Sequence, residues 1–219
     1  MPDFSLEQEF QRDLGPPPGR RKSLRVIGLD EAGRGPWAGP VVAAAVWLDA
    51  KRLPAGLRDG LDDSKKLTAK ARERLFAALQ ALPPEQAAIG LGECSVEEID
   101  AMNILQASLL AMQRAAAALS ISADAALVDG RQTPVLACPA RAVVKGDSRS
   151  LSIAAASVIA KVSRDRGMAA LALRHPGYGW ERNQGYGTAE HRAGIARLGI
   201  TAAHRRSFRP VRDALTSKP

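Results

Sequence analysis

The fold is decided by the stretch LRVIGLDEAGRGP at residues 24–36. Its first half, 24–29, is a short apolar run that ends at the acidic pair Asp30-Glu31 and leads into the glycine-rich turn Gly33-Arg34-Gly35. The next apolar run, VVAAAVWL at 41–48, has the length and composition of a second strand. Two such runs with a short connection rich in Gly and Pro predict a pair of adjacent strands, with the acidic pair at the end of the first.

The acidic pair does not belong to a helix start or to a nucleotide-binding loop. An apolar strand, and no helical pattern, follows residues 32–36, which disfavours a helix-capping role for Asp30-Glu31. The same context, and the missing third glycine, argues against a dinucleotide-binding turn. No GxxxxGK[ST] string occurs, so nucleoside triphosphates are not expected as substrates.

Downstream of this pair, helical and strand patterns alternate. We expect a helix at 68–81, a strand at 87–94, and a second helix that begins with the capping box of Ser95 and Glu98 and ends near Leu119. Strands at 125–129 and 141–145 and a long helix at 150–174 should follow. The order predicts an α/β fold, a mixed five-stranded sheet flanked by helices with a small helical C-terminal unit.

The chain divides into three parts by composition. Residues 1–23 are expected to form a flexible basic leader, because 8–23 contains the run GPPPGRRK at 15–22, which favours neither helix nor strand. Residues 24–176 should form the main domain and residues 177–219 the C-terminal unit.

The charge balance points to a polyanionic partner. The 219 residues include 31 Lys and Arg against 23 Asp and Glu, a formal net charge of +8, and such a surplus is common in nucleic-acid-binding proteins. Cys94 and Cys138 lie far apart, which indicates neither a zinc site nor a disulfide framework. No secretory signal or membrane span is apparent, so we expect a cytoplasmic protein.

Four acidic residues stand where predicted strands end, namely Asp30, Glu31, Asp129 and Asp147. Ends of neighbouring strands converge in space, so these carboxylates should share one crevice. Such a site suits Mg²⁺ or Mn²⁺, and two ions in a basic protein would suit phosphodiester hydrolysis. The alternative is that Asp129-Gly130 is only a turn and that Asp147 only caps the helix near residue 150.

The chain resembles bacterial ribonuclease HII in the string at 28–36 and in AGPVVAA at 38–44. Further motifs of that family occur in the same order, and the resemblance spans residues 26 to about 211. They are DSKKL at 63–67, VDG at 128–130, KGD at 145–147, AASVIAKV at 155–162 and GYGT at 185–188.

The resemblance implies a ribonuclease H-like fold in which 24–176 is the catalytic domain and 177–219 completes the substrate site. It implies endonucleolytic cleavage of RNA in RNA–DNA hybrids and at single ribonucleotides in duplex DNA, on the 5′ side, leaving a 3′-hydroxyl and a 5′-phosphate. Asp30, Glu31, Asp129 and Asp147 match the family's metal-binding and catalytic carboxylates.

The resemblance also implies substrate-binding residues. Gly33-Arg34-Gly35 matches the turn that recognises the ribonucleotide, and backbone groups of such a turn can read a 2′-hydroxyl. Tyr186 matches a tyrosine that packs against the adjacent sugar, although its ring alone suggests equally a role in closing the C-terminal unit. Lys145, Lys65 and Lys66 are candidates for phosphate contacts, and a solvated surface position is their alternative.

Other polar residues are expected to be structural. Asp165, beside Arg164 and Arg166, suits an intrahelical ion pair, and the three histidines suit surface or capping positions. Residues 211–219 lack the Gln-plus-aromatic pattern of a sliding-clamp peptide, and the oligomeric state is expected to be monomeric. Two competing functions are a duplex-binding module with a degenerate site and a small-molecule phosphotransferase, for which no phosphate loop is found.

Overall fold

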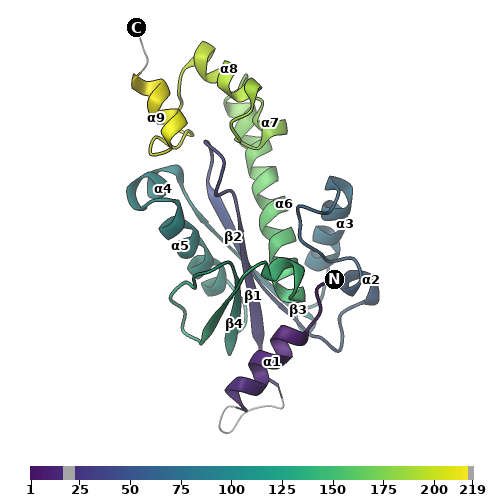
Figure 1. Ribbon diagram of the computed structural model, residues 1–219. Helices are drawn as coiled ribbons and strands as arrows, with labels where there is room; N and C mark the ends of the chain where they lie inside the picture. Colours follow the sequence, from purple (N-terminus) through teal and green to yellow (C-terminus); the bar gives the residue numbers. More distant parts are fainter. Residues whose placement is uncertain (17–22, 217–219) are drawn as a thin grey trace.

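A mixed five-stranded sheet forms the centre of the structure, a computed structural model that describes residues 1–16 and 23–216 (Figure 1). The strands lie in the order β3-β2-β1-β4-β5; the pairs β1–β2 and β2–β3 are antiparallel, whereas β1–β4 and β4–β5 are parallel. The predicted fold class is confirmed. The strands are β1 (Val26–Ala32), β2 (Val41–Leu48), β3 (Ala87–Cys94), β4 (Ala125–Asp129) and β5 (Ala140–Val143).

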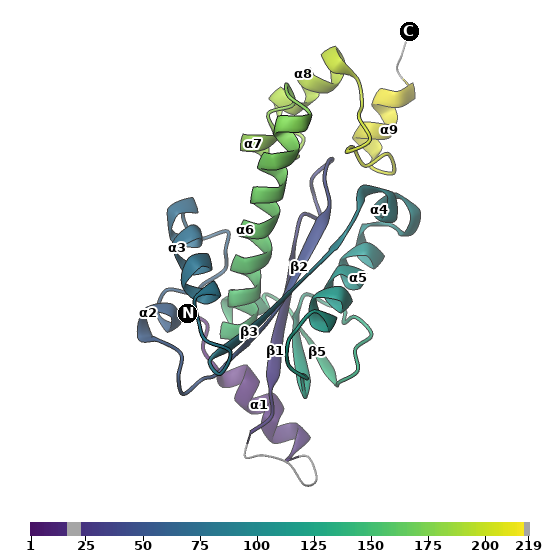
Figure 2. The same ribbon diagram turned by 180° about the vertical axis from the view of Figure 1, so that it is seen from behind.

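Helices cover both faces of the sheet (Figure 2). On one face α5 (Ile104–Ala117) packs on Ile27 and Leu29 of β1. On the other face α6 (Leu151–Arg174) crosses β1 at Gly28, where a Cβ atom would lie only 2.2 Å from the carbonyl carbon of Ser152. Glycine is therefore required for this close approach. Outside α6 lie α2 (Ala55–Arg58) and α3 (Ala69–Gln80), the latter capped by Thr68.

The long helix α6 also carries the C-terminal unit (Figure 1). Its last turns place Met168 and Leu171 against Tyr178 and Trp180, which form a separate apolar cluster with Ile195. The elements of this unit are α7 (Trp180–Asn183), α8 (Ala189–Leu198) and α9 (Arg209–Thr216). One helix therefore joins the two parts of the protein through continuous packing.

The expectation of a flexible leader is wrong for the first residues of the chain. Helix α1 (Ser5–Leu14) is formed, with Glu7 and Phe10 buried. Phe10 packs on Val26 and Leu127 of the sheet, which provides the burial that a short helix needs to be stable. The remaining part of the predicted leader, 17–22, lies outside the described residues.

Two further boundaries differ from the prediction. The helix expected from Ser95 to Leu119 is two helices, α4 (Val96–Met102) and α5, because Asn103 has a φ of 72° and its side chain caps α5 by accepting from two amides. The last strand ends at Val143 because Lys145 takes a left-handed φ of 55° before the 3₁₀ turn η1 (Gly146–Ser148). Within the described ranges, no helix combines the length and the apolar character needed to cross a membrane.

Candidate active site

Asp30 and Glu31 lie side by side at the end of β1 but project toward opposite faces of the sheet. Asp30 is 5% exposed and meets the hydroxyl of Ser157 on α6. Glu31 lines a cavity of about 290 Å³ beside Met112 of α5, and it pairs with Arg34 at 3.3 Å. This arrangement follows from the alternation of side chains along a strand.

Asp129 and Asp147 stand on the parallel side of β1. The register pairs Leu29 with Val128, so Asp129 ends β4 next to Asp30. Asp129 Oδ1 accepts a hydrogen bond from the amide of Gly146 at 2.7 Å, which links β4 to the turn that holds Asp147. Ser150, and not Asp147, caps α6, so the alternative role of Asp147 as that cap is excluded. Gly130 has a φ of 106°, as a turn after Asp129 requires.

The carboxylates influence one another electrostatically. Burial, with the charges of Glu31 and Asp129, raises the pKa of Asp30 well above its usual value. Burial raises the pKa of Asp147 as well, and the charges of Asp129 and Asp63 add to the rise. Burial also raises the pKa of Glu31, although Arg34 partly offsets the effect. Concentrated negative charge of this kind favours the binding of a cation.

The donor chemistry suits a hard divalent ion, but the side chains do not form a finished ligand cage. In the described part of the chain, no three Asp, Glu, His or Cys side chains are close enough together to hold one metal ion as they stand. Asp30 and Glu31 diverge across the sheet, and Asp129 is engaged by Gly146. Carboxylate oxygens are the ligands that Mg²⁺ and Mn²⁺ prefer, so the donor chemistry of these side chains fits such an ion.

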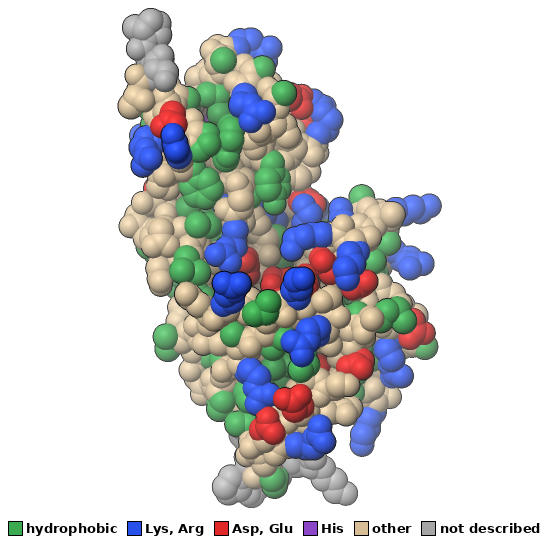
Figure 3. All heavy atoms as spheres, viewed as in Figure 1, with side chains coloured by type: hydrophobic (Ala, Val, Ile, Leu, Met, Phe, Trp, Pro, Cys, Tyr) green, Lys and Arg blue, Asp and Glu red, His purple; other side chains and the backbone are tan. Residues whose placement is uncertain are grey.

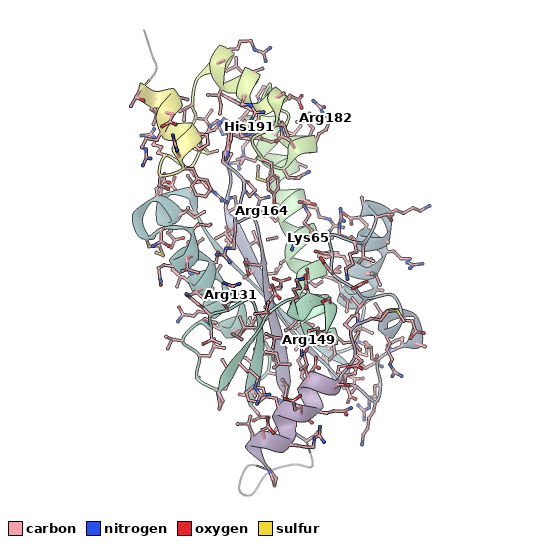
Figure 4. All side chains as sticks on the ribbon, viewed as in Figure 1. Lys65, Arg131, Arg149, Arg164, Arg182 and His191 are labelled. Atoms are coloured by element: carbon pink, nitrogen blue, oxygen red, sulfur yellow. The ribbon has the colours of Figure 1, made fainter. Side chains whose placement is uncertain are left out.

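Basic side chains surround these acids. Figure 3 shows Lys and Arg side chains around a group of acidic ones in the middle of this face. Lys65 and Arg131 lie on either side of the ends of β1 and β4 (Figure 4). Partial burial acts to lower the pKa of Lys65, but the charges of Asp30, Asp63 and Asp147 outweigh it and raise that pKa. Lys145 is exposed at the start of η1.

The turn Gly33-Arg34-Gly35 lies next to Tyr186. The side chain of Tyr186 is 48% exposed, and a Cβ atom at Gly35 would lie 3.2 Å from its ring. The loop of Tyr186 is tied to the connection after the turn, because the amide of Trp37 donates to the carbonyl of Gly185 at 2.8 Å. The tertiary structure therefore brings together two segments that are about 150 residues apart in the sequence.

Asp63 is a site neighbour that the sequence reasoning missed. The charge of its carboxylate helps to raise the pKa of Asp147, and its Oδ1 accepts a hydrogen bond from the amide of Lys65 at 2.9 Å. The loop that carries it is fixed to α6 by a 2.8 Å bond between the hydroxyls of Ser64 and Ser157. The motif DSKKL at 63–67 contained the signal, but only its lysines were interpreted.

Two of the three histidines differ from expectation, whereas His175 ends α6 at its C-cap and the intrahelical ion pair expected for Asp165 is confirmed. His191 and His204 are fully buried, not exposed, because their Nε2 atoms hydrogen-bond to each other at 3.1 Å and Trp180 donates to His191. His191 Nδ1 contacts the carbonyl oxygen of Tyr186 at 3.0 Å, so the pair supports that loop. Asp165 forms an intrahelical ion pair, but with Lys161 at 2.7 Å.

The mixed five-stranded sheet carries acidic residues at the ends of its central strands. This arrangement places the protein in the class of ribonuclease H-like nucleases. The crystal structure of ribonuclease H2 from Pyrococcus horikoshii OT3 matches with a TM-score of 0.70 at 27% identity, over 87% of this chain and 97% of that one. Ribonuclease HII from Archaeoglobus fulgidus, solved as a complex with PCNA, matches with a TM-score of 0.65 at 27% identity, over 85% and 96% of the two chains.

The family model for Ribonuclease HII matches residues 27–211. Ribonuclease HII of Rhodospirillum rubrum is 59% identical over 215 residues, which cover 98% of this chain and 92% of that protein. Ribonuclease HII of Paramagnetospirillum magneticum is 61% identical over 211 residues, or 96% and 97% of the two chains. The chain belongs to the ribonuclease HII family, and it is a metal-dependent endonuclease with ribonuclease H activity.

Proposed function

We propose that this ribonuclease H nicks duplex DNA on the 5′ side of single embedded ribonucleotides, besides cutting the RNA strand of longer hybrids, and leaves 3′-hydroxyl and 5′-phosphate ends. One observation carries the proposal. The turn Gly33-Arg34-Gly35 follows directly on Asp30-Glu31, so groups able to check for a 2′-hydroxyl adjoin the reacting phosphodiester. Tyr186 beside Gly35 is the stacking platform for the neighbouring nucleotide.

Asp30, Glu31, Asp129 and Asp147 are the proposed catalytic metal ligands, for Mg²⁺ or Mn²⁺. Two ions about 3.5–4 Å apart would activate the attacking water and stabilise the leaving oxygen. The buried carboxylates hold these positions through the strand ends and through the amide of Gly146. We propose that phosphates are contacted by Lys65, Lys145 and Arg34. These exposed cations lie near the clustered acids and offset the repulsion between the acids and the phosphates of the substrate.

The wider organisation is proposed to follow from this chemistry. Residues 24–176 form the catalytic domain, with α1 packed on it, and residues 177–219 complete the substrate site through Tyr186. We propose a monomeric cytoplasmic protein that binds RNA–DNA hybrids and ribonucleotide-containing duplexes. Residues 211–219 lack the Gln-plus-aromatic pattern of a sliding-clamp peptide, and no clamp contact through them is proposed.

The test is cleavage of a DNA duplex that contains one ribonucleotide, in Mg²⁺ and then in Mn²⁺. We expect a single nick 5′ of the ribonucleotide, none with chelator, and none with Asp30→Asn. The exposed Asp59→Asn is the matched control. Calorimetric titration with Mn²⁺ should show weaker binding to Asp30→Asn only. An Asp30→Asn protein with normal activity would refute the assignment.

The ribose-reading turn has its own test in Gly35→Ala. The added methyl group would press on the ring of Tyr186 at about the 3.2 Å approach noted above, so cleavage at single ribonucleotides should fall. Gly56→Ala is the control, because a Cβ atom there meets nothing within 4 Å. Equal activity of the two variants would contradict a role for the turn.

A further inference from the structure

Two buried arginines, Arg164 on α6 and Arg205 in the C-terminal unit, lie directly behind the turn Gly33-Arg34-Gly35. They are 2% and 0% exposed, yet neither forms an ion pair with any described carboxylate. Burial lowers the pKa of Arg164 to about 10 and that of Arg205 to about 9, so both remain cationic at neutral pH. A buried charge without a direct ion-pair partner is costly and must be stabilised by other contacts.

Among the described residues, the side chain of Arg205 hydrogen-bonds to backbone carbonyls of the segment that contains the turn, and its guanidinium also lies 5.1 Å from the centre of the Phe208 ring. Its Nη2 donates to the oxygen of Gly33 at 2.6 Å and its Nη1 to that of Arg34 at 3.1 Å. Its Nε donates to Gly39 at 2.9 Å, and Nη2 reaches Pro40 as well at 3.1 Å. One rigid guanidinium thus bridges the two ends of the segment 33–40.

Arg164 also donates to backbone carbonyls, those of the same segment and of the Tyr186 loop. Its Nε donates to the carbonyl of Pro40 at 3.0 Å and its Nη2 to that of Ala38 at 3.2 Å. Its Nη1 donates to the carbonyl of Gln184 at 3.1 Å, in the loop of Tyr186. Gly33 has a φ of 102° and packs so closely on Arg164 that a Cβ atom would overlap its Nε.

These bonds orient the turn. The carbonyls of Gly33 and Arg34 point inward to Arg205, whereas within residues 1–16 and 23–216 no acceptor engages the amides of Gly33, Arg34 and Gly35. Arg34 and Gly35 are exposed, so their amides are accessible, and these amides and the positive charge behind them both favour an electronegative oxygen of the substrate. A lysine in either place would supply the charge but not the planar fork that spans several carbonyls.

We propose that Arg164 and Arg205 are positioning residues that hold the turn in its ribose-reading conformation and couple it to the Tyr186 loop. This inference rests on the proposed function, because it assigns to the turn the recognition of the 2′-hydroxyl. It predicts that the arginines govern the choice between ribose and deoxyribose more than they govern duplex binding.

The experiment compares Arg205→Lys and Arg164→Lys with Arg174→Lys, an exposed arginine on the same helix α6. Anisotropy in chelator gives Kd for an all-DNA duplex and for the same duplex with one ribonucleotide. The preference for ribose is the Kd of the all-DNA duplex divided by the Kd of the duplex with one ribonucleotide. We expect this ratio to fall about tenfold in Arg205→Lys and Arg164→Lys, equivalent to about 1.4 kcal/mol. Binding to all-DNA duplex should change little, and Arg174→Lys should match the unmodified protein. If the arginines were merely structural, the substitutions would lower the midpoint of thermal unfolding but leave the Kd ratio unchanged at temperatures well below that midpoint. That result would overturn the proposal.

A measurement on the unmodified protein keeps the inference testable if a variant does not fold. In its NMR spectrum the Nε protons of Arg164 and Arg205 should exchange slowly with water, with couplings across the bonds to Pro40 and Gly39. Rapid exchange of both would overturn the positioning role. If the unmodified protein itself does not distinguish the two duplexes, the proposed reading by the turn fails and this inference fails with it. If it does distinguish them and Arg205→Lys does so equally well, only the inference fails.

Discussion

Replacing Glu7 by Ala should destabilise the protein much more than its place near the N-terminus implies. Glu7 is 4% exposed, and its Oε1 accepts from the hydroxyl of Ser150 at 2.6 Å and from the amide of Ser152 at 3.1 Å, besides the hydroxyl of Ser152. These donors form the start of α6, where free amides need an acceptor. Helix α1 thus completes the N-terminus of the helix that carries the C-terminal unit.

The size of the effect follows from the number of donors that would lose their acceptor. A hydrogen bond to a charged group contributes about 1.5–3 kcal/mol, and the two hydroxyls can partly rearrange, so we expect Glu7→Ala to cost about 3 kcal/mol. Glu7→Gln keeps one acceptor and should cost less. Glu9→Ala is the matched control on the same helix, since its ion pair with Arg141 is half exposed and contributes at most about 1 kcal/mol.

The assay is urea unfolding followed by circular dichroism, with the midpoint and slope compared across the variants. Glu7→Ala should lower the midpoint clearly, Glu7→Gln less, and Glu9→Ala only slightly. If Glu7→Ala and Glu9→Ala unfold at the same urea concentration, α1 does not support α6 and the reasoning is refuted.

Three further predictions concern the C-terminal unit and the substrate surface. Burial lowers the pKa of His204 to about 4 from 6.5, so its contribution to stability is complete above pH 6.5 and is lost as pH falls toward 4. The protection factors of the amides across residues 186–204, taken relative to intrinsic exchange at each pH, should therefore fall in that window, and less so in His204→Gln. Tyr186→Ala should weaken binding of a ribonucleotide-containing duplex by about 1–3 kcal/mol in anisotropy titrations, whereas Tyr186→Phe should bind nearly as well. Lys65→Gln should reduce the slope of log K for duplex binding against log salt concentration by about 1. Lys66→Gln should leave this slope unchanged, because the amine of Lys66 already pairs with Asp62.

Most of the fold could be predicted from local patterns. The helix expected at 68–81, the strand at 87–94 and the capping box at Ser95 were all confirmed, because alternation and capping chemistry depend on neighbouring residues. The break at Asn103 was missed because an asparagine inside an apolar pattern looks like a surface position unless its φ is known. Helix α1 was missed because its stability comes from Phe10 contacting strands far along the chain.

The candidate site was predictable only as a set of residue types. The positions of Asp30 and Asp129 at strand ends followed from the pattern, and parallel pairing of β1 with β4 makes them neighbours. Their mutual distances did not follow, and the side chains diverge where one tight crevice was expected. Asp63 was overlooked because a loop residue has no periodicity to reveal which strand end it approaches.

The sequence by itself determined the class of chemistry, since carboxylates at strand ends and the motif GLDEAGRGP are local properties of residues 28–36. Only the tertiary structure decided what stands behind that motif. Arg205 lies about 170 residues from Gly33 in the chain. Its role depends on the geometry of its hydrogen bonds to backbone carbonyls, and the order of residues along the chain does not specify that geometry. The burial of Arg164 and Arg205 is decided by packing around α6 and the C-terminal unit, and not by the residues next to them in the sequence.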